Sequence, residues 1–368
     1  MKKKKMFASL LFLGFFFLAA CGDDSRTAAN GSGEVNTSET SSGSGEVDTS
    51  EANGDECIGD PIIIALYPNE SGSEFEIVHE DMARLICEAT GRPGNVLTTI
   101  DYNIAIESIA NGTADLAFMG PTGYIIASNI NPNVRSILIP SGVSGTLEDA
   151  VYYSFLAVRE EDAHLWEDGQ GGYDLSLLEG ESMSFVALTS TSGFVVPAMG
   201  LDSLGFLPEG VAPEDHFGVG GPFFSEVLMG SNHQGSAFNL LTGQANVAAF
   251  FNMGSVFEIY DDFDGTVTNQ AGMIYAVRQD AEAPLDTVRG GQMRIIKSIT
   301  VPNAPFVANF DTLTEDEVES LIEIFMSDAV THNENFWATE EDVIAFNGVR
   351  DGNERYLRVP DGFFDDLR

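Results

Sequence analysis

The stretch TSTSGF, from Thr189 to Phe194, places four hydroxyl side chains in a row ahead of a glycine. It follows the apolar run SFVAL, which is typical of a strand, and precedes VVPAMGLDSLG, which we predict to be a helix. Hydroxyls and free amides at a helix amino terminus can hold a tetrahedral oxyanion without a full positive charge. The run therefore predicts an anion site, with an ordinary helix cap as the alternative. The candidate ligands are Ser190, Thr191, Ser192 and Gly193.

A second stretch, GPTGY from Gly120 to Tyr124, offers similar donors. It follows the apolar run ADLAFM and opens another predicted helix, so its first amides are also free. Glycine lets the backbone approach a ligand closely. We therefore predict that Gly120 and Thr122 face the hydroxyl run from the opposite side of the site.

The elements that must position these residues alternate along the chain. PIIIALY, NVLTTI and ADLAFMG are typical of strands, and a predicted helix follows each of them. Ser73 with Glu76 predicts a capping box for the first helix, and Asp101 is a predicted N-cap for the second. Thr314 is a third predicted N-cap, ahead of the acidic turn of TEDEVESLIEIF. This order predicts an α/β fold with mainly parallel sheets, in which ligands bind at the carboxyl ends of strands.

The charge of the chain limits its partners. It has 368 residues, with 57 acidic residues against 17 basic ones. Removal of residues 1–20 would leave 13 basic residues, a net charge of −44 and Lys297 as the only lysine. Such a surface argues against electrostatic binding of nucleic acid or of an anionic membrane.

The amino terminus, MKKKKMFASLLFLGFFFLAAC, combines four lysines with an apolar run that is too short to cross a bilayer. This is typical of a secretory signal peptide over residues 1–20. The small residues before Cys21 resemble a bacterial lipobox, in which the cysteine is lipid-modified; an uncleaved anchor or a chance cysteine is the alternative. Residues 21–56 are a predicted disordered, acidic, Gly/Ser-rich tether, because GSGEVNTSE recurs as GSGEVDTSE with almost no apolar content.

Two further cysteines, Cys57 and Cys87, are predicted to lie outside the reducing space of the cell. Cys57 precedes the first strand and Cys87 lies near the end of the helix that follows it. In a strand–helix unit the helix returns toward the start of the strand, so a disulfide is geometrically feasible. Two buried free thiols are the alternative.

The motifs of several enzyme classes are missing. The sequence contains no HExxH and no CxxC, and GVGGP is too irregular for a dinucleotide site or P-loop. The Ser190 region lacks the first glycine of a nucleophile elbow, and no aspartate–histidine pair can be assigned to it. We therefore predict no enzyme, no cofactor and no metal site, with a serine esterase as a distant alternative.

Four segments follow one another in a recognisable order: DYNIAIESIANGTADLAFMGPTGYIIA, TSTSGFVVPAMGL, GSNHQGSAFNLLTGQANVAAF and VPNAP. Together they resemble a known family, the phosphate/phosphite/phosphonate-binding proteins of ABC importers, and the resemblance covers most of Pro61 to about Pro305. It implies a two-lobed type II periplasmic-binding-protein-like fold, in which two crossing strands form the hinge. The first lobe would comprise residues 58–151 plus 299–368, and the second residues 152–298.

The resemblance also implies further site residues. Tyr102 and Tyr124 match positions whose phenols donate to ligand oxygens, with core packing as the alternative. His233, in GSNHQGS, matches a histidine near the ligand, and a structural histidine is the alternative. Asn303-Ala304 stand where the family often has an acidic residue, and Asn252 offers no carboxylate for an ammonium group. This favours phosphate, phosphite or a small alkylphosphonate over an aminoalkylphosphonate.

The function that follows from the resemblance is a lipid-anchored, monomeric receptor on the extracytoplasmic face of the membrane. It would deliver a phosphorus oxyanion to the permease and ATPase subunits of an ABC importer. Two alternatives remain open: a ligand sensor on the same scaffold, and a receptor for another small anion such as a sulfonate.

Overall fold

A computed structural model describes residues 57–70, 72–261, 269–339 and 344–367 of the chain. The predicted signal peptide, the predicted lipid-modified Cys21 and the predicted tether over residues 21–56 lie outside the described residues. Residues 54–368 form one compact unit. None of the described helices combines the length and apolar content that a membrane crossing requires.

A six-stranded mixed sheet forms the first half of this unit. Its order is β13 (Tyr356–Arg358), β4 (Val134–Pro140), β12 (Phe306–Asn309), β3 (Leu116–Phe118), β1 (Ile62–Leu66) and β2 (Gly94–Thr98). β1 pairs in parallel with β2 and β3, whereas β12 runs antiparallel between β3 and β4. The carboxyl ends of β1 and β3 therefore meet at the same edge of the sheet.

A seven-stranded mixed sheet forms the second half. Its order is β7 (Glu226–Met229), β6 (Ser182–Phe185), β8 (Val247–Phe251), β5 (Val151–Arg159), β11 (Gln292–Pro302), β10 (Ile274–Val277) and β9 (Phe257–Asp261). β6 pairs in parallel with β7 and β8, and the other pairs are antiparallel. The prediction of mainly parallel sheets is therefore wrong: both sheets are mixed, because β12 runs antiparallel in the first and β5 and β11 run antiparallel in the second. We call the first sheet with its helices the first lobe, and the second sheet with its helices the second lobe.

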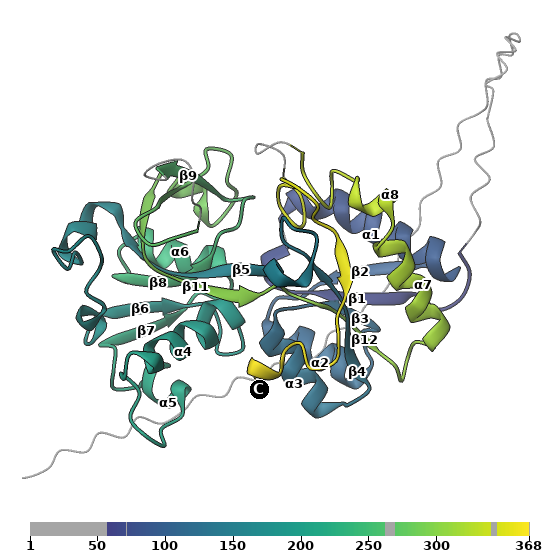
Figure 1. The fold of residues 1–368 in the computed structure, drawn as a ribbon, viewed down its shortest axis with the longest axis horizontal. Coiled ribbons are helices and arrows are strands. Elements are labelled where there is room, and N and C mark those ends of the chain that lie inside the picture. Colours follow the sequence, from purple (N-terminus) through teal and green to yellow (C-terminus); the bar gives the residue numbers. More distant parts are fainter. Residues whose placement is uncertain (1–56, 71, 262–268, 340–343, 368) are drawn as a thin grey trace, which may run out of the picture. The chain divides into compact units, whose positions relative to one another are not determined.

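Helices cover both sheets. In the first lobe, α1 (Glu76–Thr90) and α7 (Glu315–Phe325) lie side by side (Figure 1), and α8 (Asp328–Thr331) follows α7. Buried side chains of α1 and α7 share a core with β1. α2 (Tyr102–Asn111) and α3 (Pro121–Ile130) share a second core with the strands. The helices of the second lobe are α4 (Val196–Ser203), α5 (Pro213–Phe217) and α6 (His233–Leu241).

The predicted caps have different outcomes. Asp101 caps α2 by accepting from Asn103 N–H at 2.7 Å, and Thr314 caps α7 in a reciprocal capping box, so both predictions are confirmed. The Ser73–Glu76 capping box is wrong, because residues 73–75 form a short 3-10 turn and α1 begins at Glu76 without a side-chain cap. The Ser73 hydroxyl instead donates to Glu282 Oε1 at 2.6 Å.

A disulfide joins Cys57 to Cys87, with their Cα atoms 5.8 Å apart. Cys57 precedes β1, and Cys87 lies in the last turn of α1. The bond therefore fastens the first strand to the helix that follows it.

β5 and β11 form the longest ladder of the second sheet and connect it to the first (Figure 1). They pair from Arg159 opposite Met293 to Val151 opposite Pro302, with a bulge between Ile295 and Lys297. Beyond Pro302, Asn303 N–H donates to Ala150 O at 2.9 Å, and Asn303 Nδ2 donates to Pro140 O at 2.9 Å. The side chain of Asn303 thus ties the crossing strands to β4.

Candidate functional site

The two predicted donor loops meet across the lobes. Gly120 precedes the first turn of α3, and Thr122 N–H in that turn donates to Thr191 Oγ1 of the second lobe at 3.0 Å. A methyl group on Gly120 would lie 2.7 Å from the same oxygen, so only glycine allows this approach. Thr191 therefore sits directly against the amino terminus of α3.

The hydroxyl run is a tightly held turn. β6 ends at Phe185, earlier than SFVAL predicts, because Val186 N–H leaves the sheet to donate to Gly193 O at 3.2 Å. Residues 191–195 form a single π-helical turn that continues into α4. Ser190 Oγ accepts from Gly193 N–H at 3.1 Å, and Ser192 O accepts from Ser154 Oγ at 2.6 Å. Ser190 is thus a helix cap, while the neighbouring Thr191 turns its hydroxyl toward the other lobe.

The Tyr102 phenol lies in a buried cluster that the sequence only partly revealed. Tyr102 opens α2, is 2% exposed and stacks on Tyr67 with ring centroids 4.0 Å apart. Asn69 Nδ2 donates to Tyr102 Oη at 2.8 Å. A methyl group on Gly123 would overlap the Tyr67 phenol oxygen, so this cluster contacts the first turn of α3.

The imidazole of His233 is a neutral group inside the second lobe. His233 opens α6, and its Nδ1 accepts from Phe251 N–H at 3.2 Å, which leaves Nε2 as the protonated nitrogen. Complete burial lowers the pKa of His233 from 6.5 to about 3. Its backbone N–H donates to Asn69 Oδ1 at 3.4 Å, so His233 and Tyr102 share a partner.

Tyr124 is placed differently from the other predicted ligands. Its ring packs edge-on against Phe364, with centroids 5.6 Å apart. It lines a cavity of about 170 Å³ together with Phe310 and Asp361, and the lining includes neither Thr122 nor Thr191. The structure therefore brings Gly120 and Thr122 against Thr191 of the hydroxyl run and places Tyr102 and His233 around Asn69, while the ring of Tyr124 packs against the carboxyl-terminal segment.

Sequence reasoning missed Tyr67, Asn69 and Gln234. Tyr67 and Asn69 directly follow β1 in the segment LYPNE, so the rule that ligands bind at the carboxyl ends of strands would have found them. Gln234 donates through Nε2 to Asn69 O at 3.3 Å, while its buried Oε1 has no hydrogen-bond partner. This last pairing depends on the distance between the lobes, which the sequence does not reveal.

The assembled site consists of neutral donors and acceptors, and none of the residues named in it is charged. Such a site can bind and release an anion. It does not match a serine hydrolase triad, because His233 Nδ1 bonds to a backbone amide instead of a carboxylate. Among the described residues, no three His, Cys, Asp or Glu side chains gather as metal ligands do.

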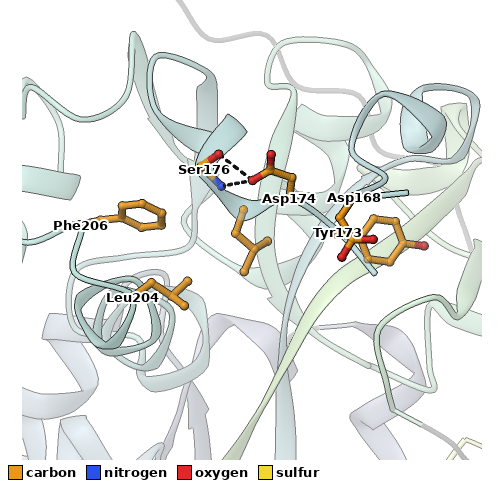
Figure 2. A pocket seen from close by; sticks show the side chains of 7 residues that line it. Asp168, Tyr173, Asp174, Ser176, Leu204 and Phe206 are labelled. Carbon is orange, nitrogen blue, oxygen red and sulfur yellow. Dashed lines mark hydrogen bonds between the residues drawn. The ribbon is translucent and has the colours of Figure 1, made fainter. Parts of the chain in front are cut away.

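A larger surface pocket of about 360 Å³ lies elsewhere in the second lobe (Figure 2). Asp174 accepts from both the amide and the hydroxyl of Ser176 there, at 3.0 and 2.6 Å. Asp168 accepts from Gln170 N–H and Gly172 N–H, and these backbone bonds hold the pKa of its carboxyl below the usual range. Both carboxylates therefore stabilise turns.

Comparison with solved structures defines the class of fold. A binding-protein component of an ABC phosphonate transporter from Pseudomonas aeruginosa matches with a TM-score of 0.57 and 17% identity, over 84% of each chain. PhnD1 from Prochlorococcus marinus, solved with methylphosphonate, matches with a TM-score of 0.55 and 13% identity, over 83% of this chain and 95% of that one. The chain thus has the fold of type II periplasmic binding proteins.

The family follows from the sequence match. The model of the phosphonate ABC transporter periplasmic substrate-binding proteins matches residues 64–346, and the chain belongs to this family. The phosphate-import protein PhnD of Mycolicibacterium smegmatis is 25% identical over 275 residues, which is 73% of this chain and 72% of that protein. The chain is therefore an extracytoplasmic substrate-binding component of an ABC importer, and its family is one of binding proteins, not of enzymes.

Proposed function

We propose that this protein captures a phosphorus oxyanion between its lobes and delivers it to the membrane permease. Phosphate, phosphite and small alkylphosphonates are the ligands that we expect. The observation that carries the proposal is the meeting of Thr191 Oγ1 with the amino terminus of α3. Donors from both lobes converge there, so an anion held at this point would bind both lobes at once.

The roles of the site residues follow from their donors. Thr191 and Ser192 offer hydroxyls, and Gly120 and Thr122 begin the helix end that faces them. Tyr102 and the Nε2–H of His233 extend this set from two further helices. Ser190 and Gly193 shape the turn. The phenol of Tyr124 is a further proposed donor, on a ring that packs edge-on against Phe364.

The ligand class is supported by the chemistry of the site. Neutral dipoles fixed inside a closed site can stabilise an anion although the protein as a whole is strongly acidic. Two similar proteins are associated with such ligands: one is named a phosphate-import protein, and the other was solved with methylphosphonate. Asn252 supplies an amide where an ammonium group would need a carboxylate, so an aminoalkylphosphonate is not favoured.

A thermal-shift screen of the chain without residues 1–20 tests the proposal. The panel contains phosphate, phosphite, methylphosphonate, 2-aminoethylphosphonate, sulfate and taurine. A ligand at 100 times its Kd adds about 2.7 kcal/mol to the free energy of unfolding, a shift of several degrees. A shift with a phosphorus oxyanion is expected; a shift with sulfate or taurine alone, or no shift at all, would overturn the ligand class.

We also propose that the mature protein is a monomer that is anchored to the membrane through a lipid on Cys21. The four lysines, the apolar run and the small residues before Cys21 support the lipid anchor. Replacing Cys21 with Ser should move the protein from the membrane fraction to the medium or periplasm. Retention of the Cys21→Ser variant in the membrane fraction would argue for an uncleaved anchor.

A further inference from the structure

A single buried side chain of the first lobe reaches the beginning of a helix in the second. Asn69 lies in the 3-10 turn Pro68–Glu70 that follows β1, and it is 4% exposed. Within its own lobe it is held by Tyr102, whose phenol accepts from Nδ2 at 2.8 Å and lies 3.1 Å from Oδ1. This pairing fixes the orientation of the amide.

The same residue makes two bonds across the lobes. Asn69 Oδ1 accepts from His233 N–H at 3.4 Å, and Asn69 O accepts from Gln234 Nε2 at 3.3 Å. His233 and Gln234 are the first two residues of α6, where backbone N–H groups lack partners inside the helix. Asn69 therefore supplies an acceptor that α6 cannot supply for itself.

The two cross-lobe bonds use no proposed ligand donor, and only the bond within the first lobe involves one, the phenol of Tyr102. Asn69 uses the backbone N–H of His233 and not its imidazole. Both polar atoms of the Asn69 side chain are already engaged with protein atoms. The residue is therefore suited to hold the lobes together and not to contact the anion.

We propose that Asn69 is a positioning residue that stabilises the closed arrangement of the lobes, and so raises the affinity for every ligand by the same factor. A contact that exists only when the lobes are closed shifts the open–closed equilibrium, and the apparent Kd falls as the closed fraction rises. This inference rests on the proposed function for its binding test, but the closure that it describes does not depend on which anion binds.

The experiment uses two variants and one control in the chain without residues 1–20. Asn69→Ala removes the acceptor for His233 N–H, and Gln234→Met removes the other cross-lobe donor while leaving the Asn69–Tyr102 pair intact. Ser73→Ala is the matched control, because Ser73 also bonds across the lobes, to Glu282, but at an exposed position. The Kd and the dissociation rate are measured for phosphate, phosphite and methylphosphonate.

Each variant is expected to raise the Kd about 5- to 30-fold. For a given variant, this factor should be the same for every ligand that the wild type binds. The loss should appear as faster dissociation, and Ser73→Ala should change little. The melting temperature of ligand-free Gln234→Met should match that of the wild type, which a merely structural role would not predict. An unchanged Kd, or a factor that differs between ligands, would overturn the proposal.

Small-angle scattering without added ligand gives a second readout. Asn69→Ala and Gln234→Met should show a larger radius of gyration than the wild type, because fewer molecules are closed. If the wild type binds none of the three anions but the variants still expand, the ligand class is wrong and the role of Asn69 stands. If the radius and the Kd are both unchanged, Asn69 does not stabilise closure.

Discussion

Thr191 is the central residue of the proposed site because its hydroxyl faces the other lobe. The residue is buried, and its Oγ1 accepts from the first turn of α3. Its neighbour Ser190 uses the same functional group for a different purpose, since it caps its own turn through Gly193. The helix-cap interpretation of TSTSGF is thus confirmed for Ser190, while the anion site stays a prediction that rests on Thr191.

Replacing Thr191 with Val tests this division. Valine keeps the shape but removes the hydroxyl, so the affinity for the ligand should fall by about 1–3 kcal/mol. The melting temperature of the free protein should change little. Isothermal titration measures the loss, with Thr189→Val as the control, because Thr189 is only half-buried and makes a single long bond to Asn103. Equal affinities of Thr191→Val and the wild type would remove Thr191 from the site.

His233 should make the protein sensitive to acid. Its pKa is about 3 in the folded protein and 6.5 ordinarily. Between pH 3 and pH 6.5 the unfolded chain therefore binds a proton at this imidazole that the folded chain does not bind. The free energy of unfolding therefore falls as pH drops, by about 2–3 kcal/mol at pH 4.5 from this group. His233→Gln cannot titrate, and urea unfolding between pH 7 and 4.5 should show a smaller loss for it. Identical losses in both proteins would contradict this prediction.

At the scale of elements, the amino terminus of α3 depends on one glycine. Gly120 has an ordinary extended backbone, which alanine can also adopt. The methyl group of an alanine there would clash with Thr191 Oγ1 of the other lobe. Replacing Gly120 with Ala should therefore separate the Gly120–Tyr124 loop from the Thr189–Phe194 loop and leave α3 itself folded.

Gly120→Ala should therefore weaken ligand binding by about tenfold or more, at a cost of roughly 1–3 kcal/mol for overpacking. The melting temperature of the free protein should change little if the lobes open to relieve the clash. Gly254→Ala is the control, since a methyl there meets nothing within 4 Å. Calorimetric titration with the ligand found in the screen would decide, and a Kd equal to that of the wild type would refute the close approach.

The elements that could be predicted correctly from the sequence are those whose first and last residues determine where they begin and end. α2 begins at the Asp101 cap and ends at Gly112, whose left-handed φ of 79° suits glycine. Ser73 and Glu76 have the same spacing as a capping box, yet tertiary structure decides otherwise, because the Ser73 hydroxyl bonds to Glu282, 209 residues away. The early end of β6 likewise depends on a turn that folds back on Val186.

The candidate site could also be predicted only where the signal lies within one element. The two donor loops could be predicted because each opens a helix directly after a strand. Asn69 and Gln234 could not be paired from the sequence, because they belong to different lobes and their contact follows from how the lobes meet. The contact of the Tyr124 ring with Phe364 could not be predicted from the sequence either, because 240 residues separate the two.

At the scale of the whole molecule, charge should control the rate of ligand capture. The chain carries a net charge of −40, and the proposed site contains neutral dipoles but no positively charged side chain to attract an anion. An approaching anion is therefore repelled at long range and held at short range. Salt shortens the range of the repulsion, since the Debye length is about 10 Å at 0.1 M and about 3 Å at 1 M.

The association rate of a phosphorus oxyanion should therefore rise with salt, by about tenfold between low and high ionic strength. The dissociation rate should stay nearly constant, because the bound anion is shielded from solvent. Stopped-flow kinetics at several sodium chloride concentrations measures both rates. A falling association rate would indicate a local cationic path into the site, contrary to the prediction.

A residue type that is rare in this chain lies beside the bulge in β11. Lys297 directly follows the bulge, pairs with Leu156 of β5, and is the only lysine after residue 5. Once residues 1–20 are removed and the new α-amine is blocked, an amine-reactive dye has one side chain to modify, on the ladder that connects the two lobes. The chain thus provides a built-in attachment point for a fluorescent reporter of lobe movement, without an engineered cysteine that would compete with the Cys57–Cys87 bond.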